Sequence, residues 1–180
     1  MRATNHMKGF IMTQHVRNIL KVYRRATSDD INNGLEWYDR AARHARTISD
    51  LYKVNIRTVV GVMAALSPNN RWERNVKDAE RMVNVFVDGG DIDDFKVSCY
   101  NAMKRKAWSI LEDNLVTDED IMHRLNGQKI RSFYSNIIGL DEVTIDGHAY
   151  NIAIGVRQGL TSDKTNMSKK VYREMQNAYV

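Results

Sequence analysis

The sequence predicts an all-helical protein, and three observations carry that prediction. Apolar residues recur at helical spacing along most of the 180-residue chain. Proline, which breaks the interior of helices, occurs once, at Pro68. Short polar or glycine-containing stretches separate the apolar segments, as they do between packed helices. We therefore expect an all-α fold of helices joined by short turns.

In the first part of the chain, the apolar pattern predicts three helices. Residues 1–12 carry no pattern and are expected to be a flexible lead-in to a single domain of residues 13–180. The first helix places apolar side chains on one face of residues 16–23, and the second runs from the capping residues at 28–30 to about residue 52. In the second helix, the side chains expected to point inward are those of Leu35, Tyr38, Ala42 and Ile48. Residues 57–66 are almost wholly apolar and predict a buried central helix.

The rest of the chain predicts further helices of ordinary length. Residues 72–87 resume the helical period, and residues 98–111 form a basic helix. Thr117 caps a short helix that runs to residue 124, and the helix over residues 130–138 ends at a glycine. Around them we expect a loop at residues 91–95, an extended segment at 143–145, a helix from Gly147 to about Val156 capped by Asp146, and a last helix at 167–180.

Composition excludes several classes of protein. Apolar residues make up 43% of the chain and charged residues 27%, which suits a packed core and not a disordered chain. Cys99 is the only cysteine, so a disulfide framework, a cysteine zinc site and an iron–sulfur cluster are excluded, and we expect no cofactor. No apolar run approaches the roughly 20 residues that cross a bilayer, so we expect no membrane partner.

Location and partner follow from the same composition. The free thiol and the absence of a secretory signal favour a cytoplasmic location, at the nucleoid or, for a phage-encoded protein, in the host cytoplasm. The net charge of +5 favours a polyanionic partner such as nucleic acid.

The residues that carry chemistry lie between positions 124 and 156. Gly127 allows the backbone to approach a phosphate closely, and the amides at the start of the next helix, which Lys129 opens, favour an anion. Asp146 lies at the start of the following helix, and antiparallel packing of the two helices would bring Lys129 and Asp146 to one cleft. A carboxylate beside an amine is the pair that breaks an N-glycosidic bond. The carboxylate stabilises the cationic sugar, and an amine whose pKa is lowered by burial attacks the sugar carbon.

Three short segments resemble the HhH-GPD (helix-hairpin-helix) DNA glycosylases. Residues 127–136, GQKIRSFYSN, and residues 143–153, VTIDGHAYNIA, are similar to the hairpin and to the Gly/Pro-Asp segment of that superfamily. Residues 65–72, ALSPNNRW, followed by Asn75, resemble its leucine-serine-x-glutamine motif, where a polar side chain enters the gap left by a flipped base. The segments occur in the order of the family. Without cluster cysteines, the chain is similar to the cluster-free branch, which includes enzymes of the 8-oxoguanine glycosylase/lyase type.

The resemblance implies a fold, an activity and a set of site residues. The fold would be a two-lobed helical bundle with a helix-hairpin-helix motif and a cleft between the lobes. The activity would be flipping of a damaged or modified base out of double-stranded DNA and cleavage of its N-glycosidic bond by a monomer. Lys129 matches the Schiff-base lysine of the enzymes that also have AP lyase activity, and Asp146 matches the family aspartate. The expected DNA contacts are Gly127, Gln128, Asn69, Asn70, Arg71, His148, Lys104 and Arg105.

Three hypotheses for function stay open at this point. The first is the DNA N-glycosylase, with lyase activity through Lys129, or without it if the family register places Gln128 at the lysine position and water attacks. The second is a non-catalytic helix-hairpin-helix DNA-binding protein, which the replacement of the first hairpin glycine by Leu125 favours. The third is a helical protein-interaction module. The substrate base is open among oxidised purines, mismatched or deaminated pyrimidines, alkylated bases and modified bases.

Each site residue also has a structural interpretation. Lys129 suits a surface lysine at a helix start, and Asp146 suits an N-cap. Asn69 and Asn70 suit a turn, and Trp72 suits packing rather than stacking on a base.

Overall fold

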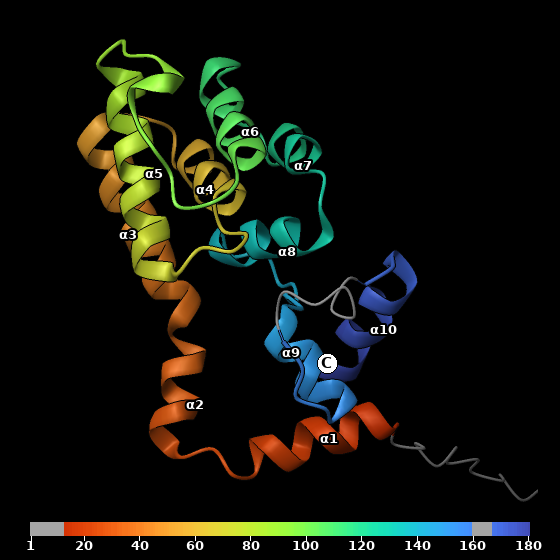
Figure 1. The fold of residues 1–180 in the computed structure, drawn as a ribbon. Helices are drawn as coiled ribbons and strands as arrows, with labels where there is room; N and C mark the ends of the chain where they lie inside the picture. The colour runs from red at the N-terminus through yellow and green to blue at the C-terminus, as the bar shows by residue number, and fades with distance from the viewer. Residues whose placement is uncertain (1–12, 160–166) are drawn as a thin grey trace, which may run out of the picture. The chain divides into compact units, whose positions relative to one another are not determined.

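A computed structural model describes residues 13–159 and 167–180 of the chain (Figure 1). The regular structure of these residues is entirely helical, with no strand among them, so the predicted all-α class is confirmed. The lead-in predicted for residues 1–12 lies outside the described residues. The chain forms two compact units, one of Ser28–Thr144 and one of Met1–Thr27 with Ile145–Val180. None of the described helices is both long enough and apolar enough to cross a bilayer.

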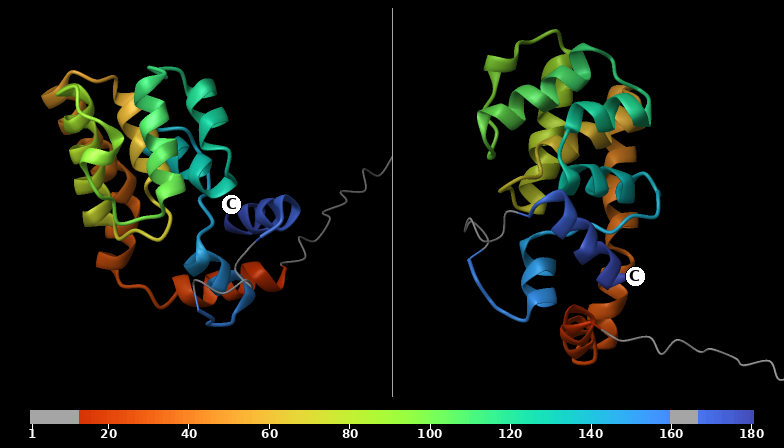
Figure 2. Two further views of the ribbon diagram at one scale, coloured as in Figure 1. Left: turned by 45° about the horizontal axis from the view of Figure 1, so that its top comes forward. Right: turned by 90° about the vertical axis from the view of Figure 1, so that its right-hand side faces the viewer.

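The larger unit is built around one buried helix. Its helices are α2 (Ser28–Leu35), α3 (Trp37–Tyr52), α4 (Ile56–Ala65), α5 (Trp72–Val87), the 3₁₀ helix η1 (Ile92–Asp94), α6 (Asn101–Glu112), α7 (Asp118–Leu125) and α8 (Gln128–Ile137). Helix α4 contacts α3, α5, α6, α7 and α8. The views in Figure 2 show α3 and α5 side by side in this unit, as their packing contacts require. The predicted central helix is therefore confirmed.

Local sequence explains how α4 reaches this position. The side chain of Asn55 caps the helix by accepting a hydrogen bond from the amide of Arg57 at 2.8 Å. All the residues of α4 from Thr58 to Ala65 are buried. At Gly61 an added Cβ would lie 2.9 Å from Cγ2 of Ile121 on α7, so the glycine allows α4 and α7 to approach each other closely.

Two predictions for this unit are wrong in detail. The single helix expected over residues 28–52 is two helices, α2 and α3, that meet at Glu36. Leu35 is 75% exposed, so its inward position is also wrong, whereas Ile48 is buried as expected. The reason is that α2 buries none of its residues and contains Gly34, so the apolar face of the unit begins only at α3. The loop predicted at residues 91–95 contains η1, whose start is fixed by a capping box: the side chain of Asp94 accepts from the amide of Asp91, and the side chain of Asp91 accepts from amides at the start of η1.

The smaller unit consists of α1 (Gln14–Tyr23), α9 (Gly147–Ile154) and α10 (Lys169–Tyr179). Helix α1 contacts both α9 and α10. Ser168 caps α10 through a bond from the amide of Val171. The buried hydroxyl of Tyr172 on α10 accepts a bond from the amide of Ile145 at 3.0 Å, which holds the segment before α9 against α10. The three predicted helices of this unit are confirmed.

Candidate nucleic-acid interface

The α7–α8 hairpin is formed by two helices joined at Asn126 and Gly127. Asn126 has a left-handed backbone with φ 48°, and Gly127 is extended at the N-cap of α8. Because Gly127 has no side chain, no side chain caps the first amides of α8. A Cβ at Gly127 would also lie 3.2 Å from Cγ1 of Ile130. The hairpin therefore presents a helix N-terminus whose amides are left for another acceptor.

Two cations hold the end of α7 at this turn. The ammonium of Lys106 donates to the carbonyl of Leu125 at 2.6 Å, and the guanidinium of Arg131 donates to the carbonyl of Met122 at 2.6 Å. These are carbonyls of the last turn of α7, where the helix dipole is negative. Burial lowers the pKa of Lys106, and the charge of Arg131 adds to that effect. Arg131 lies in the segment that resembles the glycosylase hairpin, and Lys106 lies in the predicted basic helix, but neither bond was predicted because both depend on how the helices pack around the turn.

A buried tyrosine ties α8 to the start of α7. The hydroxyl of Tyr134 donates to Oδ1 of Asp118 at 2.6 Å, and Nε of Arg57 donates to the same oxygen at 2.9 Å. Burial raises the pKa of Tyr134 well above its usual value, and its hydrogen bond to Asp118 adds to the rise. The hairpin is therefore fixed at both ends, by Tyr134 on one side and by Lys106 on the other.

The predicted nucleophile and carboxylate lie in different units. Helix α8 begins two residues earlier than expected, so Gln128 and Lys129 are its first two residues. The side chain of Lys129 is exposed, although a Schiff-base role called for burial. Asp146 belongs to the smaller unit and Lys129 to the larger one, and the cleft shared by the two residues stays a prediction.

Asp146 is the N-cap of α9, as the structural interpretation predicts. Its Oδ1 accepts a hydrogen bond from the amide of Ala149 at 2.8 Å, which fixes the carboxylate. Tyr179 donates from its hydroxyl to the carbonyl of Ala149 at 2.7 Å. Burial raises the pKa of Tyr179 to about 12, and the charge of Asp146 adds to the rise. His148 is exposed in the first turn of the same helix.

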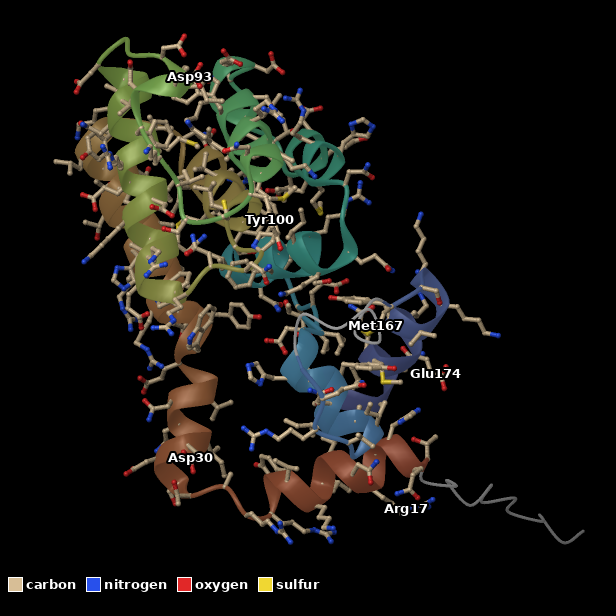
Figure 3. All side chains as sticks on the ribbon, in the orientation of Figure 1. Arg17, Asp30, Asp93, Tyr100, Met167 and Glu174 are labelled. Carbon is tan, nitrogen blue, oxygen red and sulfur yellow. The ribbon has the colours of Figure 1, made fainter. Side chains whose placement is uncertain are left out.

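The turn between α4 and α5 places its polar residues in different directions. Asn69 is exposed, has a left-handed backbone with φ 54°, and donates to the hydroxyl of Tyr100, which Figure 3 labels. Asn70 is half-buried and donates from Nδ2 to Asp78 at 3.1 Å. Arg71 is exposed. Of the predicted wedge residues, Asn69 and Arg71 therefore face solvent, while Asn70 holds the turn together.

One predicted DNA contact on α6 is corrected by the structure. The side chain of Lys104 is only 9% exposed, and its ammonium donates to the carbonyl of Phe95 at 2.6 Å and lies 4.8 Å from the centre of the Phe95 ring. This ammonium already serves a buried carbonyl, so Lys104 does not belong to a solvated basic face. Arg105, next to it, is exposed. The pattern of three successive cations did not show which of them faces the core.

Trp72 packs within the larger unit. Its ring centre lies 4.8 Å from that of Trp37 and 6.4 Å from that of Phe133. These distances are typical of aromatic pairs in protein interiors. The packing interpretation of Trp72 is therefore confirmed.

Comparison with known proteins gives one match. The model of a protein family matches residues 1–180, and its description is "Family of unknown function (DUF7178)". The chain belongs to the DUF7178 family. No curated protein and no solved structure matches it.

The described part of this DUF7178 chain was also searched for groups of side chains that could bind a metal ion. Within residues 13–159 and 167–180, no group of three or more His, Cys, Asp or Glu side chains could hold a metal ion. The hairpin of the larger unit offers an exposed cation, Lys129, and the amide groups of a helix N-terminus. These groups are suited to a phosphate backbone, which accepts hydrogen bonds and carries negative charge.

Proposed function

We propose that this DUF7178 protein binds double-stranded DNA through the α7–α8 hairpin. The observation that carries the proposal is the uncapped N-terminus of α8 at Gly127, with Lys129 exposed in its first turn. Amides at a helix N-terminus bind phosphate oxygens, and an adjacent lysine adds charge. Lys106 and Arg131 support the site by holding the preceding turn in place.

The remaining contacts follow from the residues that face solvent. Asn69 and Arg71 on the α4–α5 turn are proposed to enter the duplex beside the target base, as the resemblance to the glycosylases implies. Arg105 and His148 are proposed as further contacts to the backbone, since both are exposed. Contacts of this kind fix the register of a protein on DNA without reading its sequence.

We propose further that the protein is a DNA N-glycosylase with Asp146 as its catalytic carboxylate. The C1′–N bond breaks with its electron pair moving to the base, water attacks C1′, and Asp146 accepts the proton of that water. The bond from Ala149 orients the carboxylate and leaves its second oxygen outside the cap. In the lyase variant of this reaction the amine of Lys129, after losing a proton, replaces the water at C1′, and the C1′–O4′ bond then breaks with its electron pair and a proton moving to O4′, which leaves an imine.

The exposure of Lys129 favours two alternatives to the lyase reaction. An exposed lysine lacks the burial that the Schiff-base role called for, so the reaction with water is favoured over the lyase reaction. The same observation favours the second candidate, a non-catalytic DNA-binding protein, in which Lys129 contacts a phosphate and Asp146 is only a cap.

Asp146→Asn separates the enzyme from the binding protein. Asparagine caps helices as well as aspartate does, so the variant is expected to keep its stability and its affinity for DNA. If the protein is an enzyme, the wild type releases bases from a panel of damaged duplexes. The variant is then expected to release them more slowly by a factor of about 100 or more. Equal rates of base release by the wild type and the variant would show that Asp146 is not the catalytic carboxylate. Binding without any release would establish the second candidate.

Trapping with sodium borohydride tests the lyase reaction. The reagent reduces an imine between the protein and an abasic site to a stable covalent bond. A trapped band that is lost in Lys129→Ala would assign the nucleophile to Lys129. Base release without a trapped band would assign it to water.

A further inference from the structure

The smaller unit contains a cavity of about 810 Å³, and of its described lining residues only His148 is also used in the proposal above. Its walls are α1, α9 and the segment of residues 155–159 that follows α9. The volume is in the range of about 300–1,000 Å³ that is usual for small-molecule sites. The described lining contains the cations Lys21, Arg25 and Arg157, and it contains no carboxylate. The charge of the cavity therefore favours an anionic ligand.

The sequence builds this cavity around Gly155. The residue ends α9 with a left-handed φ of 72°, and the amide of Val156 then bonds to the carbonyl of Asn151 at 3.2 Å, which turns the chain back along the helix. A Cβ at Gly155 would lie 2.8 Å from Nδ2 of Asn18 on α1. Asn18 donates from that nitrogen to the carbonyl of Ala153 at 2.9 Å. The glycine thus lets α1 and α9, which lie side by side in Figure 1, approach each other closely.

Asn151 supplies a second feature that indicates a ligand. Its Nδ2 donates to the carbonyl of Gln158 at 2.9 Å, which holds the 155–159 segment as one wall. Its Oδ1 is buried and has no hydrogen-bond partner among the described residues. A buried acceptor without a donor is costly, so an N–H or O–H group that reached this oxygen would be stabilised there.

The remaining wall is aliphatic. Val22, Ile152 and Val156 line the cavity beside the polar groups. A flat ring packs well against such side chains, whereas a bare inorganic anion gains nothing from them. A ligand that fits all three features has a phosphate, a hydrogen-bond donor and a flat ring.

We propose that this cavity binds a nucleoside monophosphate, either free or as the 5′ end of a strand. A phosphate monoester carries about two negative charges at neutral pH, which the three cations at the cavity match. The base or the sugar donates to Oδ1 of Asn151, and the base packs on the aliphatic wall. The site consists of residues of the smaller unit alone, so it stands or falls independently of the hairpin.

Calorimetric titration of the full chain with the deoxynucleoside 5′-monophosphates tests the proposal. The corresponding nucleosides and inorganic phosphate are titrated as partial ligands, and both are expected to bind more weakly than the nucleotide. Arg25→Gln removes one charge from the lining and is expected to weaken nucleotide binding about tenfold or more, the usual effect of losing a charge-assisted bond. Arg173→Gln is the matched control, because Arg173 is exposed on α10 and outside the lining.

Two further variants separate binding from folding. Lys21→Gln changes a second exposed cation of the lining, on α1, and is expected to behave like Arg25→Gln. Asn151→Asp loses the donor to the carbonyl of Gln158 and adds a negative charge to the lining, so it is expected to abolish binding. Thermal unfolding by circular dichroism identifies the variants that keep the wild-type midpoint, and the affinities of those variants decide the question.

The source of the nucleotide is distinguished by competition. An oligonucleotide with a 5′-phosphate that displaces the mononucleotide, where its 5′-hydroxyl counterpart does not, would assign the site to a strand end. Displacement by neither would assign it to the free nucleotide. Equal affinities in Arg25→Gln and Arg173→Gln, phosphate binding as tight as the nucleotide, or no binding at millimolar concentration would each overturn the proposal.

Discussion

Replacement of Gly61 by alanine tests how closely α4 packs against the helices that carry the hairpin. The new Cβ would lie 2.9 Å from Cγ2 of Ile121 on α7 and 3.3 Å from Cγ2 of Ile110 on α6. Carbon atoms in good contact lie about 3.5–4.0 Å apart, so α7 has to move or Ile121 has to leave its rotamer. Added volume of this kind in a packed core costs about 1–3 kcal/mol.

The matched control is Gly34→Ala, because a Cβ at Gly34 would meet nothing within 4 Å. Both glycines lie in helices of the larger unit, so both variants gain the same helix propensity, about 0.5–1 kcal/mol. The difference between the two variants is therefore the packing cost alone. We expect Gly61→Ala to be less stable than Gly34→Ala by about 1–3 kcal/mol.

Urea unfolding followed by tryptophan fluorescence measures this difference. The three tryptophans of the chain, Trp37, Trp72 and Trp108, all lie in the larger unit, so the signal reports that unit. Midpoints are compared at a shared slope. If Gly61→Ala were as stable as Gly34→Ala, the close packing of α4 on α7 would be refuted, and with it the account of how the hairpin is positioned.

Three other predictions concern single groups. Alanine in place of Asp146 loses the bond from the amide of Ala149 and is expected to destabilise the chain by about 1 kcal/mol in thermal unfolding, whereas Asp146→Asn keeps its stability. Burial first, and then the charge of Asp78, raises the pKa of Cys99 to about 11, so iodoacetamide at pH 8 should alkylate native Cys99 about 100-fold more slowly than a thiol with the ordinary pKa of 9.0. For Tyr179 the folded chain holds a pKa of about 12 against 10.0 in the unfolded chain, so its contribution to stability is complete below pH 10 and is lost as the pH rises to 12. Wild type should lose more stability than Tyr179→Phe over that interval, and equal losses would show that the burial of this hydroxyl does not matter.

Local patterns predicted the helices well, because caps and apolar periodicity act over a few residues. The buried helix of residues 57–66 and the cap at Asp146 both follow from neighbouring residues, and both are found in the structure. The break at Glu36 was missed because the helical hydrogen bonds continue almost unchanged across it, from Asn32 to Arg40.

Contacts between distant segments could not be predicted in the same way. Lys104 and Lys106 are two residues apart in one basic run, yet the first bonds to the carbonyl of Phe95 and the second to that of Leu125. Which carbonyl each ammonium meets depends on the packing of α6, which no local pattern contains. The cavity of the smaller unit was missed for the same reason, since α1 and α9 come from opposite ends of the chain.

The central claim, that the α7–α8 hairpin binds DNA, is tested most directly by Gln128→Glu. The new carboxylate at the start of α8 interacts favourably with the positive end of the helix dipole, so the stability of the protein is expected to stay equal or rise. The same carboxylate repels a phosphate that binds the first amides of α8. Lys96→Gln changes the net charge equally at an exposed position before α6 and serves as the control. Fluorescence anisotropy with a labelled duplex should show an affinity lower by about tenfold for Gln128→Glu and by less than about twofold for the control. Equal losses in the two variants would contradict the claim, because the duplex would then respond only to net charge.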